Sequence, residues 1–154
     1  MSTNKTFDEV KKDLKDLALG DHKLTDIIKI ITSCTTFTDE TVKSFVGAVY
    51  DDNDSTVPLE ELYVDLTYQR KLKLLKLLQH LKRKYNGKTG FSKEKAGHID
   101  VAIRPNGRKY VWDGFRRAIM ALLCDMKDIA CSIYTHNPDI SNLKARQYEA
   151  ELFL

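Results

Sequence analysis

The residue types and spacing best suited to chemistry lie in one stretch, Val111-Trp112-Asp113-Gly114-Phe115-Arg116-Arg117. An alternating apolar segment ends there, a glycine permits a sharp turn, and two arginines follow in the expected first turn of a helix. The amino end of a helix already carries unpaired N–H groups and partial positive charge, so arginines there are unfavourable unless an anion is bound. Forked guanidinium groups suit phosphate oxygens, and Gly114, Arg116 and Arg117 are therefore predicted to bind phosphate.

Acidic and histidine side chains offer fewer candidates. Asp113 can cap the helix or hold a magnesium ion against a phosphate, and it is the candidate metal ligand. His98, at the entry to a strand, is a candidate general base, although a structural role is the commoner one for such a histidine. The fold could also bring Asp100 and Asp65 to Asp113. An arginine pair on a surface helix without any ligand remains the alternative interpretation of the motif.

The elements that must position this stretch alternate between strand and helix. The patterns predict strands near 57–62, 99–103, 109–112 and 129–133, and helices near 70–85, 114–126 and 139–154. Pro105-Asn106-Gly107 predicts a hairpin turn between the second and third strands. The order strand, helix, hairpin, helix, strand, helix predicts a compact α/β (α+β) domain over residues 57–154.

The front of the chain has a different pattern. Thr6-Phe7-Asp8-Glu9 matches a capping box, and apolar residues follow it at helical spacing. A second apolar stripe begins at Leu24, and Thr38 can cap a third helix. Residues 1–54 are therefore predicted to form an all-helical N-terminal extension, and the polar run at 51–55 is the predicted boundary.

Charge is segregated along the chain. Residues 1–65 carry seven basic and fourteen acidic side chains, whereas residues 66–93 carry nine basic side chains and no acid. Such a basic segment, from about 70 to 93, predicts contact with a polyanion such as DNA. Alternatively, its lysines solvate a helix face or lie against the acidic front. The predicted nucleic-acid-binding side chains are Lys71, Lys73, Lys76, Lys82, Arg83 and Lys84.

Several classes of protein are disfavoured. The apolar runs are too short for a membrane-spanning helix, and the polar start is unlike a secretory signal, so no membrane partner is expected. The three cysteines, Cys34, Cys124 and Cys131, lack metal-type spacing and predict buried, reduced thiols of a cytoplasmic protein. His80 and His136 are expected at the surface.

Residues 103–134 resemble the ParB-like nuclease and partition family of the ParB/sulfiredoxin-like superfamily. The resemblance lies in a hairpin strand that leads into a Gly-x-Arg-Arg box at 114–117 and then a helix containing alanine. Upstream, the segment 57–62 followed by Tyr68-Gln69-Arg70 is similar to the first box of the family. The resemblance covers residues 57–154 and implies a ParB/sulfiredoxin-like domain with a small mixed sheet.

The resemblance also implies a pocket for CTP or ATP with Mg²⁺. Gly114, Phe115, Arg116 and Arg117 would hold the nucleotide phosphates, while Gln69 and Arg70 would close the pocket. Sulfiredoxins carry their reactive cysteine at the position of Phe115, so their chemistry is not expected. The compact Tyr-Gln-Arg variant is similar to members encoded by viruses or mobile elements, which would place the protein in the host cytoplasm.

Three functional hypotheses follow. The first is a nucleotide-binding domain that acts on or near DNA. The second is a metal-dependent nuclease or nucleotide triphosphatase that uses the same pocket. The third is a protein-interaction module on a degenerate ParB-like scaffold, which would bind its partner through the helical front.

Overall fold

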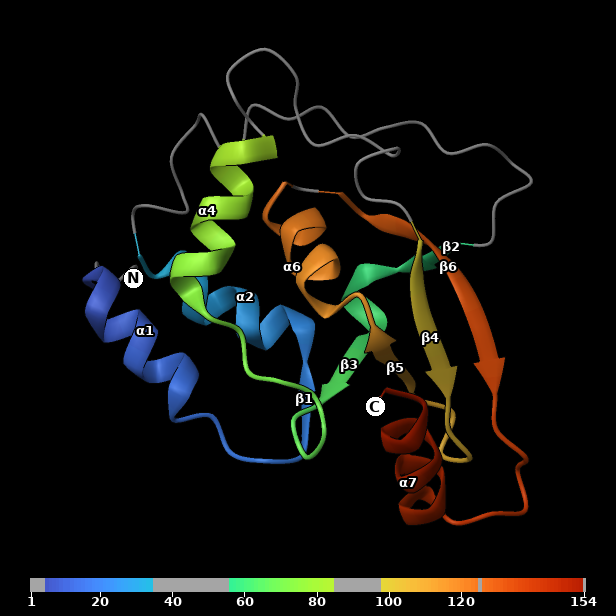
Figure 1. The fold of residues 1–154 in the computed structure, drawn as a ribbon. Coiled ribbons are helices and arrows are strands. Elements are labelled where there is room, and N and C mark those ends of the chain that lie inside the picture. The colour runs from blue at the N-terminus through green and yellow to red at the C-terminus, as the bar shows by residue number, and fades with distance from the viewer. Residues whose placement is uncertain (1–4, 35–55, 85–97, 125, 154) are drawn as a thin grey trace.

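A computed structural model describes residues 5–34, 56–84, 98–124 and 126–153 (Figure 1). The predicted third helix near Thr38 and the polar boundary at 51–55 lie outside these residues. The helices are α1 (Phe7–Lys15), α2 (Leu24–Thr32), α4 (Leu74–Lys84), α6 (Phe115–Leu123) and α7 (Asn142–Phe153), with a short 3₁₀ helix, η2 (Leu59–Glu61). The strands are β1 (Asp21–Lys23), β2 (Thr56–Pro58), β3 (Leu62–Asp65), β4 (Ile99–Ile103), β5 (Lys109–Asp113) and β6 (Asp128–Thr135).

The strands form one open, mixed sheet in the order β1-β3-β5-β4-β6-β2. Two neighbouring pairs are parallel, β3 with β5 and β4 with β6, and the other three pairs are antiparallel. β4 and β5 form the predicted hairpin, with Gly107 at φ +83° in its turn. The α/β prediction is confirmed at this level, as a mixed sheet with helices packed against it.

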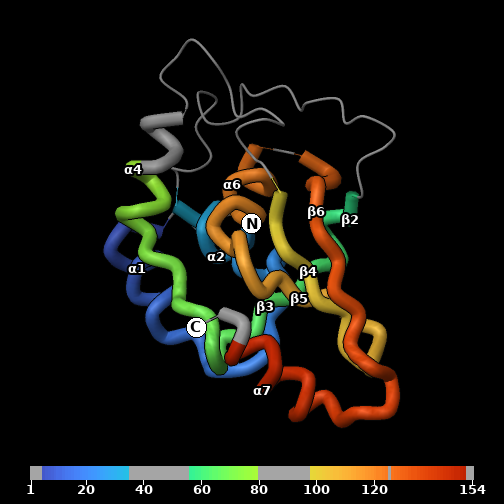
Figure 2. Tube along the Cα trace, turned by 45° about the vertical axis from the view of Figure 1, so that its right-hand side comes forward, coloured from blue at the N-terminus to red at the C-terminus, as the bar shows by residue number. Residues whose placement is uncertain are grey.

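The two faces of the sheet have different coverings. Val111 belongs to the large apolar core, together with residues of α1, α2, α4 and α6. Its neighbour Tyr110 points to the opposite face, because successive side chains of a strand alternate. On that opposite face α7 packs beside β5, apart from the other helices (Figures 1 and 2). The sheet thus separates an apolar core from a smaller layer under α7.

The front of the chain belongs to the same core. Thr6 and Glu9 form the predicted capping box of α1, and Val10, Leu14 and Leu24 are buried against the sheet layer. The prediction of an all-helical front is corrected by β1, which adds an antiparallel strand beside β3. That strand has three residues, so its sequence carried too little alternation to reveal it.

Most predicted elements of the second half are present with shifted ends. α4 begins at Leu74, later than the predicted residue 70. α7 begins at Asn142 instead of 139, because the Ser141 hydroxyl accepts the Lys144 N–H at 3.0 Å and caps the helix there. The three cysteines are free and buried, as predicted. No helix of the described ranges is long and apolar enough to cross a membrane.

Candidate phosphate-binding site

Gly114 makes the turn between β5 and α6. It is the N-cap of α6 with φ 96° and ψ 22°, a left-handed conformation that favours glycine. A Cβ at this position would lie 2.7 Å from Cγ2 of Ile99 on β4. The fold therefore requires glycine here for two reasons, and the close approach to β4 fixes where the first turn of α6 begins.

The first turn of α6 carries two arginines and no acid. Arg116 and Arg117 are both exposed, and one Nη of Arg117 donates to the backbone oxygen of His98 at 2.9 Å. Phe115, predicted among the phosphate-binding residues, is 6% exposed, and its ring lies in the apolar core. The ring anchors the turn, and the backbone N–H is the group that Phe115 can offer a ligand.

Gln69 lies next to this turn but does not face solvent. It is 7% exposed, and its side-chain amide donates to the backbone oxygens of Trp112 at 2.6 Å and Val111 at 3.3 Å. Both donors of the Gln69 amide are therefore used within the fold, and its predicted role in closing a nucleotide pocket stays a prediction. Its hydrogen bonds hold the segment after β3 against the end of β5, and the next residue, Arg70, is exposed.

Asp113 is paired with Asp100 across the β4–β5 ladder, next to a register shift. Burial, the charge of Asp113 and a hydrogen bond between the two carboxyl groups raise the pKa of Asp100. Among the described residues no group of three or more metal-binding side chains occurs. Two carboxylates nevertheless suit Mg²⁺, which commonly binds one or two together with substrate phosphates. Asp65 instead binds Arg104, Arg146 and the Thr67 N–H.

Asp113→Asn should lower the pKa of Asp100 toward its ordinary value. The wild-type Asp100 pKa is raised above 3.8, so the folded state binds more protons than the unfolded state in the interval just above that pH. Wild-type stability should therefore fall, relative to Asp113→Asn, as pH rises through that interval. Carboxyl ¹³C titration measures the pKa, with Asp139→Asn as an exposed control. An Asp100 pKa that does not change in Asp113→Asn would contradict the pairing.

The basic helix is described only in part. Lys73 and Lys76 are exposed, as a nucleic-acid contact requires. Lys71 instead donates to the backbone oxygen of Lys15 at 2.7 Å, at the end of α1, so a structural bond accounts for this lysine. The side chains of Lys82, Arg83 and Lys84 lie outside the described residues, and so does the segment 85–97.

A buried group of charges under α7 was not foreseen from the sequence. We call it the α7 cluster, and it consists of Asp65, Arg104, His136, Arg146 and Glu149. Arg104 donates to Glu149 at 2.8 Å through both Nε and Nη2, and Nη2 also lies 2.9 Å from Asp65. His136, expected at the surface, is 3% exposed and lies 2.9 Å from Glu149. The hydrogen-bonded pairs of the cluster are 13 to 81 positions apart in the sequence, so no spacing rule connects them.

In the α7 cluster, carboxylates are paired with guanidinium groups of opposite charge. Burial raises the pKa of Asp65, but hydrogen bonds from Thr67, Arg104 and Arg146 outweigh it and lower the pKa overall. Burial and the hydrogen bond to Glu149 raise the pKa of Tyr68, whose hydroxyl donates to Glu149 at 2.6 Å. A largely buried group in which the carboxylates and guanidinium groups bind one another is suited to fastening α7, and Nδ1 of His136 is its one buried ring atom without a hydrogen bond among the described residues.

Comparison with protein-family models finds no match to this chain, and neither curated proteins nor solved structures give one. Any function proposed for this chain therefore rests on its own sequence and geometry.

Proposed function

We propose that this chain is a ParB-like domain that binds a nucleoside triphosphate, CTP or ATP with Mg²⁺, at the start of α6 and acts on or near DNA. The observation that carries the proposal is the first turn of α6, where two exposed arginines stand at the positive end of a helix with no acid in that turn. Such an arrangement becomes more favourable once a polyphosphate neutralises it.

Each residue has a role in this proposal. Arg116 and Arg117 bind phosphate oxygens through their guanidinium groups, and the backbone N–H groups of the first turn add further donors. Arg70, on the segment that Gln69 holds against β5, supplies a third positive charge. Asp113 and Asp100 would hold Mg²⁺, which would neutralise phosphate charge. Gly114 sets the position of the whole turn.

The order of elements supports the ParB-like assignment. Strand β2, helix α4, the β4–β5 hairpin, helix α6, strand β6 and helix α7 follow one another in the predicted order, although the predicted strand 57–62 ends at Pro58 and is followed by η2 and the additional strand β3. The Gly-x-Arg-Arg box lies where a hairpin strand meets a helix, which is the context that the resemblance implies. The free, buried cysteines support a reducing compartment, so we propose a cytoplasmic location, in the host if the chain is virus-encoded.

Contact with DNA is supported by the exposed lysines of the basic helix. Lys73 lies just before α4, and Lys76 lies on its first turn. Lysines of this kind attract a phosphate backbone without reading its sequence. We therefore propose a salt-dependent, sequence-independent DNA contact along α4.

Hydrolysis of the bound nucleotide or of a nucleic acid is the second candidate function. The observation that favours it is the pairing of Asp100 with Asp113 beside the arginines. Two oriented acids with a metal can position a water molecule for attack on phosphorus. Multiple turnover that stops when magnesium is chelated would identify the protein as a hydrolase.

Binding of CTP or ATP with magnesium should stabilise the fold. A ligand at about 100 times its Kd adds about 2.7 kcal/mol to the free energy of unfolding. Urea unfolding with each triphosphate, against the matching nucleoside as control, measures this gain. If no triphosphate changed the unfolding midpoint at millimolar concentration with magnesium present, the nucleotide proposal would be rejected.

A further inference from the structure

A second polar cavity lies at the far end of β5 from the α6 turn. We call it the hairpin pocket, and its volume is about 540 Å³, within the range of small-molecule sites. It lies between the β4–β5 turn, η2 and the junction of β1 with α2, and the residues that matter for its chemistry are Lys23, Thr25, Glu60, Glu61, Tyr63 and Arg108. Lys109, the first residue of β5, lines it, whereas Gly114 follows the last residue of that strand.

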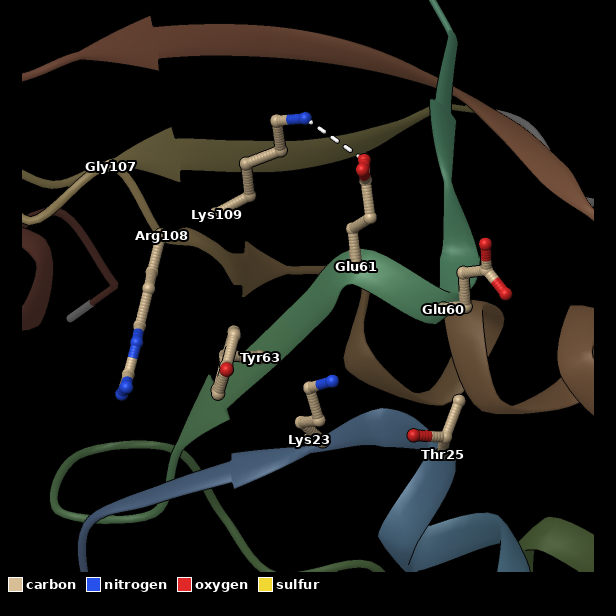
Figure 3. Close-up of a pocket in the computed structure, with 8 residues that line it drawn as sticks. All are labelled: Lys23, Thr25, Glu60, Glu61, Tyr63, Gly107, Arg108 and Lys109. Carbon is tan, nitrogen blue, oxygen red and sulfur yellow. Dashed lines mark hydrogen bonds and ion pairs between the residues drawn. The ribbon is translucent and has the colours of Figure 1, made fainter.

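Two cationic side chains of the hairpin pocket lie near the ring of Tyr63. Its half-buried ring packs against Tyr110 at 5.6 Å between centroids. The guanidinium carbon of Arg108 lies 4.8 Å from the centre of the Tyr63 ring, and Nζ of Lys23 lies 6.0 Å from it. Figure 3 shows Arg108 on one side of Tyr63 and Lys23 near its other side. The ring thus has one positive charge on each side of it.

The charges of the pocket are mixed, which limits what it can accept. Lys109 forms an ion pair with Glu61 at 3.1 Å, so its charge is largely matched. Arg108 has a longer ion pair, 3.9 Å from Asp21. Glu60 and Glu61 lie across the pocket from Arg108 (Figure 3). These carboxylates would repel a long nucleic-acid strand, but they can accept hydrogen bonds from the hydroxyl or amino groups of a small ligand.

We propose that the hairpin pocket binds a small phosphomonoester that also carries hydroxyl or amino groups. The phosphate lies at the edge of the Tyr63 ring, where Lys23 on one side and Arg108 on the other can each donate to it. The hydroxyl or amino groups donate to Glu60 and Glu61. This site is independent of the nucleotide proposed at α6, because the two share no residue and lie at opposite ends of β5.

The test is an amide NMR titration with ribose 5-phosphate, with ribose as the matched ligand that lacks phosphate. Wild-type signals from Lys23, Gly107 and Arg108 should shift with ribose 5-phosphate and not with ribose. Arg108→Gln combined with Lys23→Gln should weaken binding at least tenfold, and Arg108→Gln alone should weaken it measurably. Both variants change exposed side chains, and their spectra report whether the fold is kept.

Arg116→Ala with Arg117→Ala separates this site from the α6 site. That variant should bind ribose 5-phosphate at the hairpin pocket as tightly as the wild type does. Equal shifts with ribose, shifts confined to residues 114–117, or unchanged affinity in the Arg108→Gln and Lys23→Gln protein would each overturn the hairpin-pocket proposal. Loss of triphosphate binding at α6 would leave these results unaffected.

Discussion

Replacing Glu149 by glutamine should lower the free energy of unfolding by about 3–5 kcal/mol, because it removes one partner of a buried ion pair. Glu149 is fully buried and accepts hydrogen bonds from Arg104 and from Tyr68. The variant keeps the shape of the side chain but leaves the Arg104 guanidinium with less than its full set of negative partners. Ala145 is the one buried apolar residue among the described side chains of α7, so little apolar contact can compensate.

Urea unfolding measures this loss, and Glu151→Gln is the matched control. Glu151 lies on the same helix and is exposed, so its substitution should change stability by less than about 0.5 kcal/mol. Amide exchange should also show reduced protection of α7 in Glu149→Gln. If the two variants were equally stable, the α7 cluster would not be what fastens the helix.

Gly114→Ala should destabilise the fold by about 2–6 kcal/mol. Alanine at φ 96° is strained by about 1–3 kcal/mol, and forcing an extra methyl group into a packed contact adds about 1–3 kcal/mol. The added Cβ would meet Ile99, whose position is fixed by its strand. The same substitution should shift the first turn of α6 and so weaken triphosphate binding.

Gly107→Ala provides the control for backbone strain. Gly107 also has positive φ, +83°, but nothing lies within 4 Å of a Cβ added there. Its substitution should therefore show the conformational cost without the clash, and the difference between the two variants isolates the contact with Ile99. Chemical denaturation of both proteins gives that difference. Equal losses would mean that β4 yields to the methyl group and that Gly114 is not held against it.

The sequence predicted local features well where neighbouring residues determine them. The capping box at Thr6 and Glu9, the hairpin at Gly107 and the start of α6 at Gly114 all depend on neighbours within a few positions. The ends of β5 and β6 shifted by one or two residues, and the strand predicted at 57–62 ends at Pro58, because burial and pairing decide where a ladder stops. The short β1 escaped detection because three residues carry no measurable period.

Side-chain roles that depend on distant partners were not predictable. Gln69 was predicted to line a nucleotide pocket, but its side-chain amide donates to two backbone oxygens of β5. Lys71 was predicted to contact DNA, but its ammonium group donates to a backbone oxygen at the end of α1. No sequence motif marks Arg104 and Glu149 as partners, although the fold buries them together. In each case the deciding contact joins segments that only the tertiary structure brings together.

The central claim is that the start of α6 binds triphosphate, and isothermal titration calorimetry with CTP, ATP and GTP tests it most directly. Each nucleotide is titrated with and without magnesium into wild-type protein and into Arg116→Ala with Arg117→Ala. Lys73→Ala with Lys76→Ala is the control, because it removes the same charge from exposed positions on another element.

We expect magnesium-enhanced binding in the wild type and in the lysine control, and loss of that binding in the arginine variant. Binding that survived in the arginine variant would contradict the claim by placing the ligand elsewhere. Absence of binding to folded wild-type protein at millimolar ligand would also contradict it, and would favour the hypothesis of a protein-interaction module.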